Sequence, residues 1–82
     1  MPFPLAQKLH DTKPKSKILL LLTKREKQIL EFISQEFSNR EIAEQLCLSH
    51  HTVRSHRKNL IQKFQVKKSV GLVRKGFEIG AL

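Results

Sequence analysis

The sequence predicts an all-α fold: four short helices preceded by a flexible N-terminal tail. Ser or Thr residues stand where each helix would begin, and apolar residues follow each of them at helical spacing. No stretch alternates apolar and polar residues for long enough to predict a strand. At 82 residues, the chain makes one small domain, which buries only about 60% of the surface that its unfolded form exposes. A self-contained enzyme with a deep pocket is therefore not expected.

Residues 1–22 are predicted to be a linker or tail, mostly disordered, ahead of a domain that covers residues 23–82. Pro2, Pro4 and Pro14 interrupt helices, and the lysines around Pro14 have almost nothing to bury. The apolar run Ile18–Leu22 has two interpretations. It is either an extended arm that packs on the first helix or the cut end of a longer linker. It is far shorter than the roughly 20 apolar residues that span a bilayer.

Two capping boxes open the first two predicted helices. In Thr23–Glu26 and in Ser38–Glu41, a hydroxyl residue at the N-cap is followed three positions later by Glu. The apolar residues predicted to face the core from these helices are Ile29, Leu30, Ile33 and Phe37 for the first, and Ile42, Ala43 and Leu46 for the second.

The third and fourth predicted helices begin at a serine as well. Ser49 is expected to cap a helix over about residues 50–64, and Ser69 to begin one over about residues 69–79. Gly80 is a suitable residue to end the fourth helix. The residues predicted to face inward are Val53, Leu60 and Phe64 for the third helix, and Leu72, Val73 and Phe77 for the fourth.

The charge of the chain is concentrated in its second half. There are 16 basic and 7 acidic residues, a net charge of +9. No acidic residue lies between Glu44 and Glu78, whereas eight basic residues do. A charge run is usually only a solvated surface, but eight bases without one acid indicate a polyanionic partner. Nucleic acid, an acidic protein and an anionic membrane surface are the candidates at this point.

The second and third helices, joined by a tight turn at residues 47–49, have the pattern of a helix-turn-helix. In this motif the second helix enters the DNA major groove with its N-terminal half. A helical projection of the third predicted helix places Leu60 and Phe64 within about 20° of Val53. The opposite arc, at about 100–240°, holds residues that can form hydrogen bonds to bases, namely His51, Arg54, Ser55, Lys58, Asn59 and Gln62.

The order and spacing of these segments resemble the LuxR/FixJ/NarL family of helix-turn-helix domains over residues 22–80. The segments that carry the likeness are Leu22–Glu26, Phe37–Ala43, Leu48–Ser49, Thr52–Asn59 and Lys63–Phe64. The resemblance implies a compact four-helix helix-turn-helix domain that binds sequence-specific sites on double-stranded DNA as a homodimer. It also implies a role in transcription regulation, commonly as the output half of a response regulator in a two-component system.

The resemblance further implies which residues contact DNA and which join two subunits. Base contacts are expected from His51, Arg54, Ser55 and Lys58. Phosphate contacts are expected from Asn39, Ser49, Thr52, Arg57 and Lys63. The fourth helix is similar to the one that pairs the subunits, and we expect its contacts at Val70, Arg74 and Phe77.

Three positions depart from the pattern of the family. Glu36 and Gln65 stand where the family usually has Gly, after the first and third helices. A residue other than Gly in a left-handed cap costs about 1 kcal/mol. Gly71 stands where the fourth helix often has an acidic residue, and Gly71 and Gly76 are both expected to weaken that helix.

Metal binding and catalysis are not expected. Cys47, His50, His51 and His56 allow a zinc hypothesis, but His56 is directed away from His51 on the same helix, and a structural zinc site needs four convergent ligands. Ser49 and the neighbouring histidines lack an orienting acid. We therefore expect no enzyme activity, no cofactor and no small-molecule ligand in this chain. A single cysteine and the absence of a signal-peptide pattern favour the cytoplasm, without membrane association.

Two further functions stay open at the level of sequence. The chain resembles, more weakly, region four of a sigma factor, which acts with RNA polymerase; the predicted fourth helix favours the first family. A helix-turn-helix can also serve as a protein-interaction module for an acidic protein or for RNA polymerase. The basic residues on the outer arc of the third helix favour binding to DNA over binding to a protein.

Overall fold

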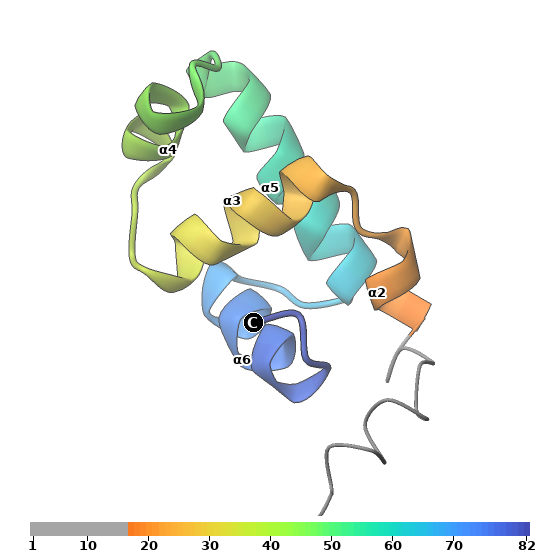
Figure 1. Ribbon diagram of the computed structural model, residues 1–82. Coiled ribbons are helices and arrows are strands. Elements are labelled where there is room, and N and C mark those ends of the chain that lie inside the picture. The colour runs from red at the N-terminus through yellow and green to blue at the C-terminus, as the bar shows by residue number, and fades with distance from the viewer. Residues whose placement is uncertain (1–16) are drawn as a thin grey trace, which may run out of the picture.

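The computed structural model describes residues 17–82. Within that range the chain forms helices and no strand, which confirms the all-α fold class. The helices, labelled as in Figure 1, are α2 (Lys17–Leu21), α3 (Lys24–Ser34), α4 (Asn39–Leu46), α5 (His50–Phe64) and α6 (Ser69–Glu78). The four predicted helices correspond to α3 through α6. Of the tail predicted for residues 1–22, positions 1–16 lie outside the described residues.

Side-chain caps begin three of these helices, as the sequence predicts. The Oγ1 of Thr23 accepts from the Glu26 amide at 3.0 Å, and Glu26 Oε1 accepts from the Thr23 amide at 3.0 Å. The same reciprocal pair joins Ser38 and Glu41 at the start of α4. Ser49 Oγ accepts from the Thr52 amide at 3.0 Å and caps α5. These bonds satisfy amides that the first turn of a helix otherwise leaves without a partner.

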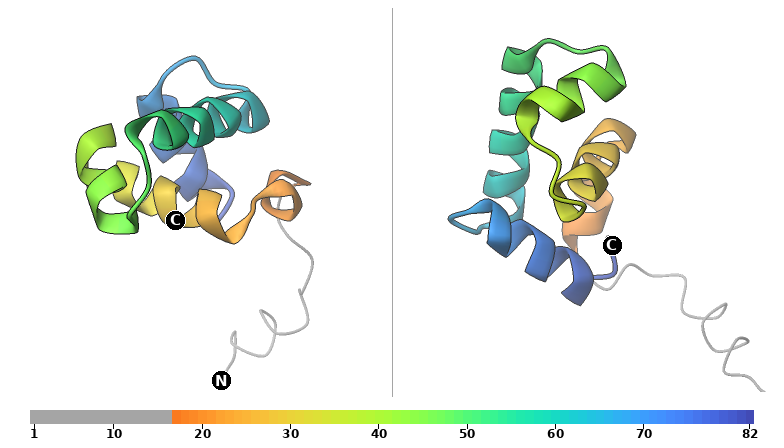
Figure 2. Two further views of the ribbon diagram at one scale, coloured as in Figure 1. Left: turned by 90° about the horizontal axis from the view of Figure 1, so that it is seen from above. Right: turned by 90° about the vertical axis from the view of Figure 1, so that its left-hand side faces the viewer.

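Helix α5 is the central element of the domain. It packs against α2, α3, α4 and α6, which lie around it (Figures 1 and 2). Its apolar stripe of Val53, Leu60 and Phe64 is completely buried, as predicted. The rest of the core comes from the neighbouring helices and the residue after α6, with Ile29, Leu30, Ile33, Ile42, Ala43, Leu72 and Ile79 buried.

The prediction that Phe77 faces inward is wrong. Its side chain is 64% exposed, whereas Leu72 is completely buried. At 100° per residue, Phe77 lies about 140° around the helix from Leu72, and Gly76 only about 40°. Gly76 and Ile79 therefore accompany Leu72 on the inner side of the α6 segment.

The interpretation of Ile18–Leu22 as an extended arm on the first helix is also wrong. Lys17–Leu21 is helical, and this helix, α2, packs on α5. Ile18, Leu19 and Leu22 are partly buried against the core. Ile and Leu tolerate a helix, and the extended N-cap residue Thr23 then separates α2 from α3.

The described helices are short. The longest, α5, has 15 residues, and none of those in residues 17–82 has the length and hydropathy that crossing a membrane requires.

Candidate nucleic-acid interface

The turn between α4 and α5 lies at one end of the domain, with the first half of α5 beside it (Figure 1). Cys47 reverses the chain in a left-handed conformation, with φ 55° and ψ 44°. The Leu48 amide then donates to the Ala43 carbonyl at 2.9 Å, and Ser49 starts α5. Buried Ile42, Ala43 and Val53 belong to the same core cluster, so the two helices of the motif are held by packing as well.

The four residues predicted to contact bases share one exposed arc of α5. His51, Arg54, Ser55 and Lys58 are all exposed. Within residues 17–82, the side chains of Arg54 and Lys58 form no hydrogen bond or ion pair. Their donors are therefore free for an external partner, and Arg and Lys both match the acceptors on the major-groove edge of guanine.

Three of the predicted phosphate residues lie at helix starts at this end of the domain. Ser49 and Thr52 are exposed or partly exposed at the start of α5, and their hydroxyl oxygens are 2.8 Å apart. Asn39 is the first residue of α4. Helix starts present free amides and a partial positive charge, which suit phosphate oxygens.

Arg57, the fourth predicted phosphate residue, is bonded inside the fold. Its Nη1 donates to Asn39 Oδ1 at 2.7 Å, and its Nε donates to Ser69 Oγ at 2.9 Å. Burial lowers the pKa of the guanidinium from its ordinary value, and arginine still stays charged at neutral pH. A helical projection places Arg57 only about 40° from Val53, beside the apolar stripe and off the outer arc of α5.

Lys63, the fifth, lies near the far end of α5. Its Nζ is 2.7 Å from Glu26 Oε1 and 2.8 Å from the carbonyl oxygen of Leu21. Glu26 is only 3% exposed. Burial raises the pKa of this carboxyl, but hydrogen bonds from Lys63 and Thr23 and the charges of Lys63 and His56 outweigh burial and lower the pKa overall. The structure thus separates Lys63 from the other predicted DNA contacts.

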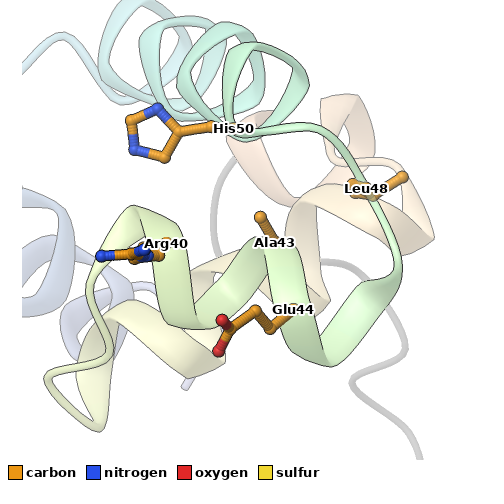
Figure 3. A pocket seen from close by; sticks show the side chains of 5 residues that line it. All are labelled: Arg40, Ala43, Glu44, Leu48 and His50. Atoms are coloured by element: carbon orange, nitrogen blue, oxygen red, sulfur yellow. The ribbon is translucent and has the colours of Figure 1, made fainter.

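Sequence reasoning did not include Arg40 and His50 among the DNA contacts. Both are exposed, and with Ala43, Glu44 and Leu48 they line an open groove of about 390 Å³ between α4 and the start of α5 (Figure 3). Their side chains extend toward the same side of the groove in Figure 3. The signal was available, because each lies within two residues of a predicted N-cap.

The three residues expected in the dimer surface are exposed on α6. Val70 is 77% exposed, Phe77 is 64% exposed, and Arg74 lies between them. The residues expected to pair the subunits are therefore accessible to a partner.

The zinc hypothesis involves Cys47, His50, His51 and His56. Cys47 is an exposed free thiol. In the part of the chain that the structure describes, no three His, Cys, Asp or Glu side chains come together as a metal site requires.

Comparisons with known proteins relate this chain to a family of bacterial regulators. Residues 20–75 match the sequence model of the family described as bacterial regulatory proteins, luxR family. The transcriptional regulatory protein UhpA of Escherichia coli is 46% identical over 57 residues, which cover 70% of this chain and 29% of UhpA. The spore germination protein GerE of Bacillus subtilis is 47% identical over 47 residues, which cover 57% of this chain and 64% of GerE.

A solved structure of the transcription factor GerE is similar as well. It has a TM-score of 0.72 and 35% sequence identity, and the match covers 76% of this chain and 92% of that one. The matched part of the present chain spans less than two thirds of the length of UhpA and of the GerE sequence.

Proposed function

The chain belongs to the luxR family of bacterial regulatory proteins, a family of DNA-binding transcriptional regulators with a helix-turn-helix, and from this premise we propose that α5 reads base edges in the major groove of double-stranded DNA. The observation that carries the proposal is the exposed arc of α5, whose Arg54 and Lys58 have no partner within residues 17–82. Arg54 and Lys58 reach guanine acceptors, and His51 and Ser55 complete the contact with the bases. A bacterial regulator of this kind acts in the cytoplasm, where we place the chain.

Phosphate contacts flank this arc at the starts of α4 and α5. Asn39, Ser49 and Thr52 supply them, together with two exposed basic residues, Arg40 and His50, of the groove in Figure 3. Arg57 and Lys63 are left out, because two donors of each already bond within the fold, those of Arg57 to Ser69 and Asn39 and those of Lys63 to Leu21 and Glu26. DNA could reach only the donors that these bonds leave over, and both side chains are held in place by the fold.

Two copies of the chain bind together, through Val70, Arg74 and Phe77 of α6. A single α5 offers only a few side chains to the bases, so one subunit alone binds weakly. A two-fold pair places its recognition helices in successive major grooves, about 34–36 Å apart, on a roughly palindromic site. The exposure of Val70 and Phe77 supports this pairing.

The test of the base readout is the selection of bound duplexes from a random-sequence pool, followed by titration of variants at fixed salt. Arg54→Ala and Lys58→Ala are expected to weaken binding to the selected site by about 1–3 kcal/mol and to relax the preference at one base position each. Lys67→Ala is the control, since Lys67 is an exposed base in the turn after α5. It should weaken all sequences alike and reduce the salt dependence.

A pool that yields no enriched sequence would contradict the proposal and favour a protein-interaction module. Unchanged binding of Arg54→Ala and Lys58→Ala to the selected site would contradict the assigned contacts alone.

A further inference from the structure

One guanidinium joins three helices of this domain. Arg57 lies on α5, and its two bonds reach Asn39, the first residue of α4, and Ser69, the first residue of α6. The guanidinium is planar and rigid, so the directions of its two bonds are fixed relative to each other. Within residues 17–82 no carboxylate lies on it; its two acceptors are neutral. The position of this side chain is therefore determined by Asn39 and Ser69, not by an ion pair.

The start of α6 has no other side-chain bond of this kind. Its N-cap residue, Lys68, makes no side-chain cap, whereas Thr23, Ser38 and Ser49 cap the three preceding helices. The buried side chain of Leu72 and the buried Gly76 lie further along α6. Lys75 Nζ, in the last turn of α6, also donates to the carbonyl oxygen of Phe64 at the end of α5, at 2.9 Å. The bond from Arg57 to Ser69 is a second contact, at the other end of α6. Two contacts at separate places along α6 limit the angle between α6 and α5.

The angle between α6 and α5 affects where α5 lies along the DNA. At 1.5 Å per residue, the 15 residues of α5 extend over about 22 Å, so a tilt of about 10° moves its far end by about 4 Å. Successive base pairs are about 3.4 Å apart. A small change in the angle between α6 and α5 would therefore shift the recognition helix of each subunit by about one base pair.

We propose that Arg57 is a positioning residue that sets the spacing between the two half-sites, by holding the pairing helix α6 at a fixed angle to α4 and α5. This rests on the proposed function, in which α6 joins two subunits and α5 reads bases. Arg57 itself contacts neither bases nor phosphates.

The test is a selection from duplexes with two copies of the preferred half-site and a spacer of variable length. The full chain is compared with Arg57→Met, Arg57→Lys and Ser69→Ala, and far-UV circular dichroism checks the helix content of each. Lys67→Met is the control for charge, because it removes one positive charge from an exposed position on the turn after α5. Affinity for each spacing and for a single half-site is then measured as a function of salt.

The unaltered chain should select one spacing. Arg57→Met and Ser69→Ala should spread the selection over spacings one base pair longer and shorter, with about a 3–10-fold loss on the original spacing, the range in which one or two modest contacts fall. Arg57→Lys keeps the charge but replaces the planar fork by one ammonium nitrogen on a flexible stem, whose donors have no fixed directions, so it should spread the selection as well. Binding to a single half-site should fall no more in Arg57→Met than in Lys67→Met. Ser69→Ala, which changes no charge, should keep the salt dependence of the unaltered chain.

An unchanged spacing in both Arg57→Met and Ser69→Ala would overturn this inference and leave the proposed function intact. A second result would also overturn it. Arg57→Met would lose affinity equally on all spacings, its salt dependence would fall by the amount of one phosphate contact, and Ser69→Ala would show neither change. A residue that binds phosphate behaves in this way. If the unaltered chain selected no spacing at all, the paired binding proposed above would fail, and this inference with it.

Discussion

Glu26 is the one buried charged side chain in residues 17–82, and it acts in two ways. Its Oε1 caps α3 by accepting from the Thr23 amide, and it is the partner of Lys63 on α5. Lys63 also donates to the carbonyl oxygen of Leu21 at the end of α2. Three helices thus meet at one ion pair. Removing Lys63 leaves the buried carboxylate of Glu26 without its charged partner, which is the costly way to break such a pair, whereas Lys63 is 30% exposed and can be hydrated.

Acid should weaken the fold through Glu26. Its pKa is lower in the folded chain than in the unfolded one, so the ionised carboxylate stabilises the fold at pH values above the unfolded pKa, about 4.3. This contribution is lost as the pH falls through the lower folded pKa. Urea unfolding between pH 7 and pH 3 should show a stability difference between the unaltered chain and Glu26→Gln that shrinks below about pH 4.3.

Two other variants complete this measurement. Glu41, whose pKa is lowered by hydrogen bonding to Ser38, is present in both proteins and cancels from the comparison. Lys63→Met should also be less stable than the unaltered chain at neutral pH, and adding Glu26→Gln to it should recover part of the loss. Parallel stability curves for the unaltered chain and Glu26→Gln would show that the ion pair contributes nothing.

At the scale of elements, the same hydrogen-bond pattern ends four helices. After α3, α4, α5 and α6, one amide bonds three residues back and the next amide bonds five residues back, which is the Schellman motif. The residue between the helix and the following chain is left-handed each time, namely Glu36, Cys47, Gln65 and Gly80. Only the last of these is Gly. The first three helix ends therefore carry backbone strain that the fourth does not.

Replacing Gln65 by Gly should stabilise the domain. Its φ of 57° costs about 1–2 kcal/mol for a residue with a Cβ, and the extra entropy of Gly in the unfolded chain offsets part of this. The expected net gain is about 0.5–1 kcal/mol, measured by urea unfolding. Gly80→Ala is the matched control, with φ 81° and no atom within 4 Å of the added Cβ, so only strain is introduced. A stabilised Gly80→Ala would contradict this account.

The two glycines inside α6 should respond differently to alanine. A Cβ at Gly71 would lie 2.9 Å from Val66 Cβ, close to the backbone of the turn, which cannot move freely. A Cβ at Gly76 would lie 2.8 Å from Leu82 Cδ1, the end of a side chain at the last residue. Alanine gains about 1 kcal/mol of helix propensity at either position. Gly76→Ala should therefore be neutral or stabilising, and Gly71→Ala less stable than Gly76→Ala by about 1–3 kcal/mol. Equal thermal stability of the two would argue against close packing at Gly71.

The sequence predicted the helices well because local chemistry determines their ends. The capping residues Thr23, Ser38 and Ser49 stand one residue before the helices that they were expected to start, and α5 has its predicted bounds. The left-handed turns at Glu36 and Gln65 were visible only as departures from a family pattern, and the one at Cys47 was not foreseen. A residue other than Gly gives no local signal for such a turn.

The candidate site was predicted less completely, because charge alone does not reveal a partner. Arg54 and Lys58 lie on the outer arc of α5 and are exposed, as their helical positions indicate. Arg57 and Lys63 are bases on the same helix, but their partners Asn39, Ser69 and Glu26 are 12 to 37 residues away in the chain. The helical projection showed only that these two lie off the outer arc. Finding what they bond to required the tertiary structure.

At the scale of the whole domain, DNA contacts and subunit contacts are expected on separate elements. The turn that starts α5 lies at one end of the domain, and α6 lies near its other end (Figure 1). The eight basic residues between Glu44 and Glu78 lie on α5, in the turn after it and on α6. This separation means that the two proposed contacts can be removed one at a time.

Phe77→Asp should remove pairing without removing the fold. Its side chain is 64% exposed, so the core loses little. In a two-fold symmetric interface both subunits contribute the same surface, so Phe77→Asp places two negative charges in one interface. Like charges in an interface repel each other. The variant should sediment as a monomer under conditions where the unaltered chain forms dimers. Its affinity for a duplex with two half-sites should fall to that for a single half-site, while its thermal unfolding stays close to that of the unaltered chain.

Leu20→Asp is the matched control, since Leu20 is also a large apolar residue, 70% exposed, on α2. It should leave both sedimentation and the preference for paired half-sites unchanged. The opposite result, with pairing lost in Leu20→Asp and kept in Phe77→Asp, would move the subunit contact to α2. The angle that Arg57 fixes between α6 and α5 would then have no bearing on half-site spacing, so this one comparison also decides whether α6 can position the second recognition helix.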